Sequence, residues 1–243
     1  MTKVALITGG ARGIARGVAL DLAARGWSVA ICYRTSAREA DKTVAAVAAH
    51  GVKGLALQAD VSQPQAATDL IQRVHAELGR IDALVNGAGP YHRVPLLQET
   101  NASWHSMFDN NLHPVFYLTQ AVIPIMKQQH WGRIVCFTMA NAEKLVAQPN
   151  LTAHYISKVS IIALARSFAK VIAADGITIN CIAPGYIDSG SAPKDELERA
   201  VKTIPAGYVG SVDDAVALTR FLLSDEARYI NGANIQVSGG WGV

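Results

Sequence analysis

The chain has 243 residues, of which 50% are hydrophobic and 17% are charged, and its formal net charge is +3. This length and composition suit one domain with a large core, and so small a charge, without a Lys/Arg-rich run, does not indicate nucleic-acid binding. No apolar run reaches the length of about 18 residues that a membrane span needs, and a strand-like run begins close to Met1, so we expect neither an anchor nor a signal peptide.

Apolar runs typical of strands alternate with segments of helical periodicity along the whole chain, and no linker divides them. This alternation predicts a single α/β domain over residues 1–243, a doubly wound, Rossmann-like parallel sheet with helices on both faces. Ligands are then expected at the carboxyl ends of the strands. The expected strands are 3–8, 28–33, 54–59, 82–86, 132–138, 176–182 and 233–237, and the expected helices are 14–25, 36–50, 64–78, 100–112, 114–129, 153–174, 194–202 and 212–223.

The first strand runs directly into a glycine-rich turn at residues 8–15, TGGARGIA, and then into the first helix. Glycine permits positive φ and lets a pyrophosphate approach the backbone. The unpaired N–H groups and the dipole at a helix N-terminus favour a phosphate. Taken alone, the turn fits a pyrophosphate site and tight strand–helix packing about equally well.

The second strand ends at Arg34-Thr35-Ser36, and no Asp or Glu stands at 32–36. An NAD site usually places an acid here to accept hydrogen bonds from the ribose hydroxyls. Arg34, together with Arg12 in the glycine turn, is suited to clamp a 2′-phosphate instead, because a guanidinium binds phosphate through two N–H groups. The pair favours NADPH, with a solvated loop cation as the alternative for Arg34.

A polar pair, Asn110 and Asn111, lies just before Pro114 in a helical stretch. Because Pro114 has no N–H to bond the carbonyl of Asn110, we expect a kink at this point. A kink beside two polar residues indicates a site, although an Asn111 side chain bonded locally within its helix is the alternative.

The three cysteines, Cys32, Cys136 and Cys181, each lie in an apolar, strand-like run. Buried cysteines in odd number are typical of reduced thiols in a cytoplasmic protein, and we prefer this interpretation to disulfides, metal ligands or nucleophiles. We therefore expect a cytoplasmic protein without a metal site.

Three more segments add to the glycine turn: residues 86–89 (NGAG), residues 176–185 (GITINCIAPG), and the C-terminal run through residues 238–241 (SGGW). Together these ordered motifs resemble those of the short-chain dehydrogenase/reductase family over the whole chain. Two positions depart from the family pattern, since Ala15 replaces the last glycine of the first turn and Gly87 replaces an asparagine. The resemblance implies an NAD(P)-dependent oxidoreductase that forms homodimers or homotetramers through the fourth and fifth helices.

The resemblance also implies which residues contact the cofactor. Asp60 and Val61 would hold the adenine, with a helix cap as the alternative role for Asp60, and Ile187 and Ser189 would contact the nicotinamide amide. The polar stretch at about 186–210 would form a short substrate lid. The expected cofactor-binding residues are Gly9, Arg12, Gly13, Ile14, Arg34, Asp60, Val61, Asn86, Gly87, Ala88, Lys158, Pro184, Gly185, Ile187 and Ser189.

Carbonyl reduction in the family needs a Tyr as general acid, a Lys four residues later, a Ser that polarises the substrate, and an Asn that supports a proton relay. Lys158 stands at the expected distance before Gly176, and Asn111 matches the relay Asn. The Tyr position holds His154, and Tyr155 is the next residue. Around the helix, His154 and Tyr155 lie on opposite sides of Lys158, so either side chain can reach a site that Lys158 lines.

The Ser position holds Met139, and Thr138 is a weak candidate for substrate polarisation, because successive strand residues face opposite ways. These departures resemble those of enoyl-acyl-carrier-protein reductases and pteridine reductases, in which the Ser or Tyr position also varies. Hydride transfer to a polarised C=C or a protonated C=N does not need a Tyr. Either Tyr155 or His154, whose ordinary pKa is ~6.5, is expected to donate the proton, while Lys158 binds the ribose hydroxyls and holds the nicotinamide.

The sequence thus predicts an NADPH-dependent reductase that transfers a hydride to a C=O, C=C or C=N of a small molecule, with a non-standard proton donor. One alternative is a non-catalytic NADP(H)-binding sensor or partner subunit. Another is a conventional ketoreductase whose helix is shifted so that Tyr155 occupies the usual place. The expected catalytic residues are Lys158, Tyr155, His154, Asn111 and Thr138.

Overall fold

The computed structural model describes residues 2–190 and 194–243. Its centre is a parallel sheet of seven strands in the order β3-β2-β1-β4-β5-β6-β9, as the alternating pattern predicts. The five residues of β1 are all buried, as expected for a parallel strand with both faces covered. The strands are β1 (Val4–Thr8), β2 (Ser28–Tyr33), β3 (Gly54–Gln58), β4 (Ala83–Asn86), β5 (Gly132–Phe137), β6 (Ile177–Pro184) and β9 (Asn234–Val237).

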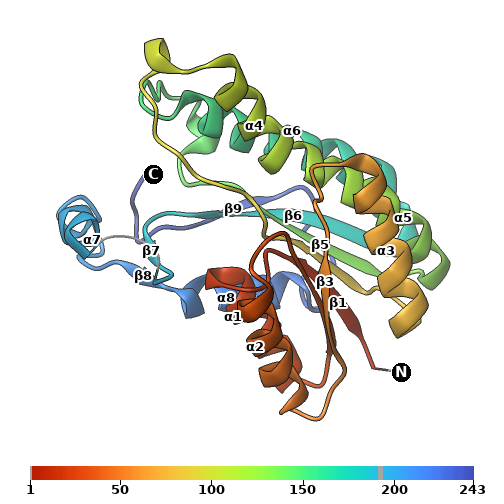
Figure 1. Cartoon of the computed structure of the whole chain (residues 1–243). Coiled ribbons are helices and arrows are strands. Elements are labelled where there is room, and N and C mark those ends of the chain that lie inside the picture. Colours follow the sequence, from red (N-terminus) through yellow and green to blue (C-terminus); the bar gives the residue numbers. More distant parts are fainter. Residues whose placement is uncertain (1, 191–193) are drawn as a thin grey trace.

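Helices cover both faces of this sheet, with α3, α4, α5 and α6 on one side and α1, α2 and α8 on the other (Figure 1). Apolar side chains such as Leu118 and Ile161 form the core on the first side, and Leu22 and Val216 belong to the core on the second. Each such buried side chain contributes about 1.5–3 kcal/mol. The helices are α1 (Gly13–Ala24), α2 (Ala37–Ala48), α3 (Pro64–Leu78), α4 (Asn101–Asn111), α5 (His113–Gln129), α6 (Thr152–Ile172), α7 (Lys194–Val201) and α8 (Val212–Leu222).

The kink expected before Pro114 is confirmed, because α4 ends at Asn111 and α5 begins at His113. Two features were not expected. Two-residue strands, β7 (Ile187–Asp188) and β8 (Gly210–Ser211), pair in a separate small sheet. Short 3-10 helices, η1 (Leu96–Gln98), η2 (Ala142–Lys144) and η3 (Ala173–Asp175), lie in the connections.

Part of the expected lid at 186–210, residues 191–193, lies outside the described residues. The helix expected at 194–202 is present as α7. In the described part of the chain, no helix combines the length and the apolarity that a membrane crossing requires.

Candidate active site

The glycine turn between β1 and α1 has the backbone geometry of a phosphate loop. Gly9 and Gly13 have φ of 69° and 56°, a left-handed conformation that favours glycine. Arg12 is the N-cap of α1 and makes no side-chain capping bond. The first N–H groups of α1 are therefore available to an anion, where the helix dipole also favours negative charge.

The turn after β4 packs directly against this glycine turn. Thr8 Oγ1 accepts hydrogen bonds from the backbone N–H groups of Gly87 and Ala88, both at 3.1 Å. A Cβ on Gly87 would lie 2.9 Å from the methyl of Ala15. The two departures from the family pattern thus meet in space, because the added methyl at position 15 occupies room that a side chain at position 87 would need.

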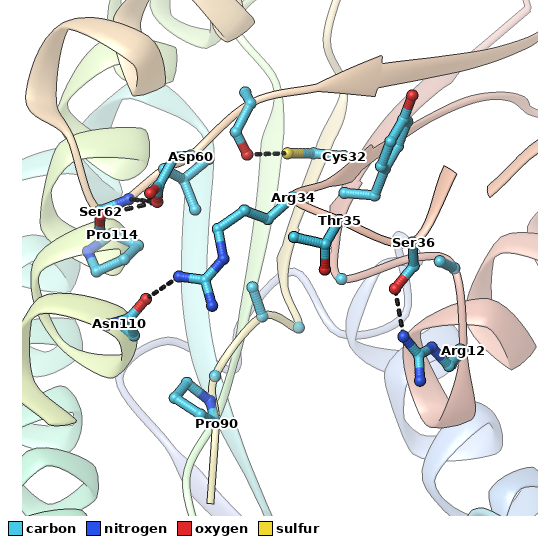
Figure 2. Close-up of a pocket in the computed structure, with 18 residues that line it drawn as sticks. Arg12, Cys32, Arg34, Thr35, Ser36, Asp60, Ser62, Pro90, Asn110 and Pro114 are labelled. Carbon is cyan, nitrogen blue, oxygen red and sulfur yellow. Dashed lines mark hydrogen bonds between the residues drawn. The ribbon is translucent and has the colours of Figure 1, made fainter. Parts of the chain in front are cut away.

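A cavity of about 320 Å³ opens beside the ends of β1, β2 and β3. Arg12 and Arg34 both line it, with Arg34 extending toward Asn110 and Arg12 lying beside Ser36 (Figure 2). Arg34 Nη1 donates a hydrogen bond to Asn110 Oδ1 at 2.7 Å, and Arg12 donates to Ser36 Oγ. Asp60 is the one carboxylate among the described residues that line this cavity. The cavity therefore carries two fixed positive charges at the end of β2, where an NAD site would place an acid.

Asp60 forms a turn with Ser62 and leaves α3 without a side-chain cap. Its Oδ1 accepts from the backbone N–H and the hydroxyl of Ser62, at 3.1 and 2.7 Å. The N-cap of α3 is Gln63, with no side-chain capping bond. Asp60 therefore does not cap α3, which was its alternative expected role. Its side chain instead forms a local turn with Ser62, just before the N-cap residue.

A second cavity, of about 340 Å³, lies further along the carboxyl ends of the strands. Gly9, Arg12, Gly87 and Gly89 line both cavities, so the two adjoin, and we call them together the cofactor groove. The second cavity is also lined by Gly13, Ile14, Ala15, Phe137, Thr138, His154, Lys158, Pro184 and Ser189.

Three expected cofactor contacts do not line the groove. Asn86 is buried, and its amide donates to Cys136 Sγ at 3.5 Å. The Ile187 side chain packs against Gly210 of β8, and the Gly185 backbone packs against Ser238. These residues shape the turns around the groove rather than its surface.

Lys158, on α6, is buried and lines the second cavity. Its Nζ donates to the carbonyl of Phe137 at 3.0 Å, which leaves two N–H groups of the ammonium for other partners. Burial lowers the pKa of Lys158 from 10.5 to about 8, and the nearby thiols of Cys136 and Cys181 oppose this shift. At pH 7 the side chain is therefore still charged, but it releases its proton more easily than an exposed lysine.

Asn111 faces the same space as Lys158. Its Nδ2 donates to the carbonyls of Met107 and Pro90, at 3.0 and 3.2 Å, while its Oδ1 is buried with no partner. A Cβ on Gly89 would lie 2.5 Å from Asn111 Oδ1 and 3.4 Å from Lys158 Nζ. Glycine at position 89 therefore keeps open the space that the amide oxygen and the ammonium share.

His154 lines the second cavity but is not poised to release a proton near neutrality. Burial, and then the charge of Lys158, lower the pKa of His154 to about 3. The ring hydrogen-bonds the carbonyl of Pro90, Nδ1 is buried without a partner, and Tyr91 packs edge-on at 5.1 Å. The expectation of an ordinary histidine pKa was wrong, because burial and the nearby charge of Lys158 disfavour the charged form of the ring, while its hydrogen bond to Pro90 opposes the shift.

Tyr155 and Thr138 were also expected to donate the proton or polarise the substrate, but their hydroxyls are already hydrogen-bonded within the protein. The Tyr155 hydroxyl accepts from the N–H of Val146 at 3.0 Å and donates to the carbonyl of Asn141 or Ala142, and Tyr155 does not line either cavity of the groove. Thr138 lines the second cavity, but its hydroxyl donates to Asn234 Oδ1 at 2.7 Å.

Sequence reasoning missed several contributors to the groove. Ser36 and Asn110 hold the two arginines, and Gly89 and Pro90 shape the space around Asn111. The polar pair before Pro114 was a signal for Asn110, because it placed two amides at the expected kink. Nothing local in the sequence indicated that Pro90 would reach His154.

Comparison with known proteins gives one consistent result. Residues 9–242 match the family model described as enoyl-(acyl carrier protein) reductase. The chain is 37% identical to the 3-oxoacyl-(acyl-carrier-protein) reductase FabG of Staphylococcus aureus (strain Mu50), over 99% of this chain and 98% of that protein. It is 35% identical to the FabG of Salmonella typhimurium, over 98% and 96%. A solved structure, acetoin dehydrogenase YohF from Salmonella typhimurium, superimposes with a TM-score of 0.91 at 29% identity, over 99% and 96% of the two chains.

Proposed function

The chain belongs to the short-chain dehydrogenase/reductase family of NAD(P)-dependent oxidoreductases, and from that premise we propose that it is an NADPH-dependent reductase with a proton donor other than tyrosine. One groove runs from the uncapped N-terminus of α1 to the buried ammonium of Lys158, and this continuity carries the proposal. The groove offers a pyrophosphate site at one end and an acid group, the Lys158 ammonium, at the other, and one dinucleotide would extend between them. The substrate is a small molecule with a reducible C=O, C=C or C=N.

NADPH fits the charges at the adenosine end of the groove. Arg12 and Arg34 flank the first cavity, and Ser36 lies within hydrogen-bonding distance of Arg12. A 2′-phosphate between two guanidinium groups accepts charge-assisted hydrogen bonds that a 2′-hydroxyl cannot match. Asp60 Oδ2 is not used by Ser62 and would accept from the adenine amino group. When bound, the cofactor supplies the hydride.

Lys158 supplies the proton in this proposal. Its ammonium lines the cavity, keeps two N–H groups unused by Phe137, and has a pKa lowered to about 8. Lys158 would give a proton to the atom of the substrate's double bond that does not receive the hydride, and would become a neutral amine. A proton from solvent would then return to the amine, and Asn111, whose unpartnered oxygen lies beside the same glycine, Gly89, as the Lys158 ammonium, would support this relay.

His154 shapes the cavity wall in this proposal and does not protonate the substrate. A neutral imidazole has one N–H, and here the ring donates to the carbonyl of Pro90. Its other nitrogen, Nδ1, is buried without a partner, so the ring acts as part of the cavity wall. Carbonyl substrates are the first to test, because the relatives above are named for 3-oxoacyl groups and for acetoin.

The decisive assay follows NADPH absorbance with 3-oxoacyl thioesters, α-hydroxy ketones, enones, cyclic imines and a dihydropterin. We expect turnover with at least one compound at saturating NADPH, loss of about 100-fold or more in kcat for Lys158→Met, and a smaller loss for His154→Gln, because the ring lines the cavity but gives no proton to the substrate. If the wild type binds NADPH but reduces none of these compounds, the rival function is favoured, a non-catalytic NADP(H)-binding sensor or partner subunit.

We further propose that the protein forms homodimers or homotetramers and works in the cytoplasm. Phe116 on α5 and Ile156 and Val171 on α6 are large apolar side chains that remain exposed in the single chain and would be covered in such an assembly. The three cysteines are buried free thiols, which suits a reducing compartment.

A further inference from the structure

The segment that follows β5 is held in a backbone conformation that needs support. Asn141 and Leu145 have φ of 62° and 51°, the left-handed region. A leucine there is strained, because its Cβ approaches the following carbonyl. The connection from Met139 to Leu151 also carries η2 and exposes the Leu145 side chain, which is 73% accessible. Such a segment keeps its shape only if other contacts fix it.

Tyr155 provides those contacts from the first turn of α6. Its hydroxyl accepts the N–H of Val146 at 3.0 Å and donates to the carbonyl of Asn141 at 3.2 Å or of Ala142 at 3.4 Å. One buried oxygen therefore bridges both ends of residues 141–146, which we call the clamped loop. The Tyr155 ring packs in a small apolar cluster with Ala142, and Met139 lies against the same cluster.

The clamped loop is continuous with the wall of the catalytic end of the groove. Thr138 lines the second cavity, and the clamped loop begins three residues later. Met139 stands where the resemblance places the substrate-polarising Ser, and it packs on the cluster that Tyr155 organises. A movement of the clamped loop would therefore be passed through Met139 to Thr138, which lines the second cavity.

We infer that Tyr155 is a positioning residue, which fixes the clamped loop as the substrate-side wall of the site and takes no part in proton transfer. The tyrosine displaced by one position from the family's place thus has a different task. Its loss weakens substrate binding, while the acid group of the reaction stays intact. The kinetic part of this inference rests on the proposed function, whereas its structural part does not.

The test compares Tyr155→Phe with Tyr229→Phe, a matched loss of a hydroxyl from a side chain that is 99% exposed. Trypsin cleavage after Lys144, an exposed residue within the clamped loop, reports how often the loop opens. Because the lost hydroxyl removes contacts at both ends of the loop, we expect cleavage to be about tenfold faster or more in Tyr155→Phe and unchanged in Tyr229→Phe. Adding Leu145→Asn, which tolerates the left-handed region better, is expected to slow the cleavage again.

The kinetic readout uses the panel compound that the wild type reduces fastest. Tyr155→Phe is expected to raise KM about tenfold, with kcat within about twofold, an unchanged pH profile and unchanged NADPH affinity. Cleavage at the wild-type rate would overturn the inference. So would a loss of about 100-fold in kcat with normal cleavage, because Tyr155 would then be the proton donor. If no compound is reduced, the proposed function fails, but the cleavage rates still decide the role of Tyr155.

Discussion

Replacing Lys158 with methionine is expected to stabilise the protein while it abolishes reduction. Burial lowers the pKa of Lys158 from 10.5 to about 8, and each pKa unit is worth about 1.4 kcal/mol, so holding the charge costs about 3 kcal/mol at neutral pH. Methionine keeps the apolar stem, but the Phe137 carbonyl loses its partner, which costs about 1 kcal/mol. The net gain is about 2 kcal/mol, or about 4–8 °C in Tm for a chain of this size.

Urea unfolding of the cofactor-free wild type and Lys158→Met, from pH 6.5 to 10, tests this reasoning. The folded-state pKa of Lys158 is the lower one, so between about 8 and 10.5 the unfolded state binds more protons and the wild type gains stability as pH rises. The difference between the proteins is therefore largest below pH 8 and shrinks above it. Lys42→Met, at an exposed site, is the control and should show no gain. A Lys158→Met protein that is no more stable at pH 7, or a difference that does not change with pH, would refute the buried charge.

Other predictions concern both ends of the groove. In the reducing direction, kcat/KM is expected to be level below about pH 8 and to fall above it, because Lys158 must be protonated. No step is expected near pH 6.5, because His154 stays neutral. Steady-state rates measured against pH check both expectations. Arg34→Ala should weaken NADPH binding about 10- to 100-fold and leave NADH unchanged, as measured by fluorescence titration, since the lost charge-assisted bonds contribute about 1.5–3 kcal/mol. Gly87→Ala should lower Tm in calorimetry, because the new Cβ lies 2.9 Å from the Ala15 methyl and 2.7 Å from a β1 carbonyl; Ala15→Gly should restore only part of the loss.

The fold was predictable because its signals are local. Four apolar residues followed by a glycine turn and a helical pattern identify β1 and α1, and the same reasoning places the other strands of the large sheet. Pro114 fixed the break between α4 and α5 by removing one N–H. By contrast, β7 and β8 have two residues each and no apolar run, so periodicity gives no sign of them.

The cofactor end of the site was predictable for a similar reason, since glycines and arginines at fixed places in short turns define it. The catalytic end was not, because the state of its groups depends on residues distant in sequence. Burial and the charge of Lys158 lower the pKa of His154, and Tyr91 packs on its ring. Helical geometry allowed Tyr155 to reach the site, but its hydroxyl is taken by the backbone of the preceding connection.

Pairs of unusual residues show the same limit. Ala15 and Gly87 each read as a single departure from a motif, and neither motif reveals that the two positions touch. A Cβ at position 87 would lie 2.9 Å from the Ala15 methyl and 2.7 Å from the Thr8 carbonyl. Contacts between turns on separate strands cannot be inferred from the spacing within either turn.

Isothermal titration of the wild-type protein with NADPH and with NADH tests the central claim, that the N-terminus of α1 and two arginines hold a phosphorylated dinucleotide with its reactive end near Lys158. The charges of Arg12 and Arg34 at the first cavity predict that both cofactors bind and that NADPH binds at least about tenfold more tightly. Binding of neither cofactor, or tighter binding of NADH, would contradict the account.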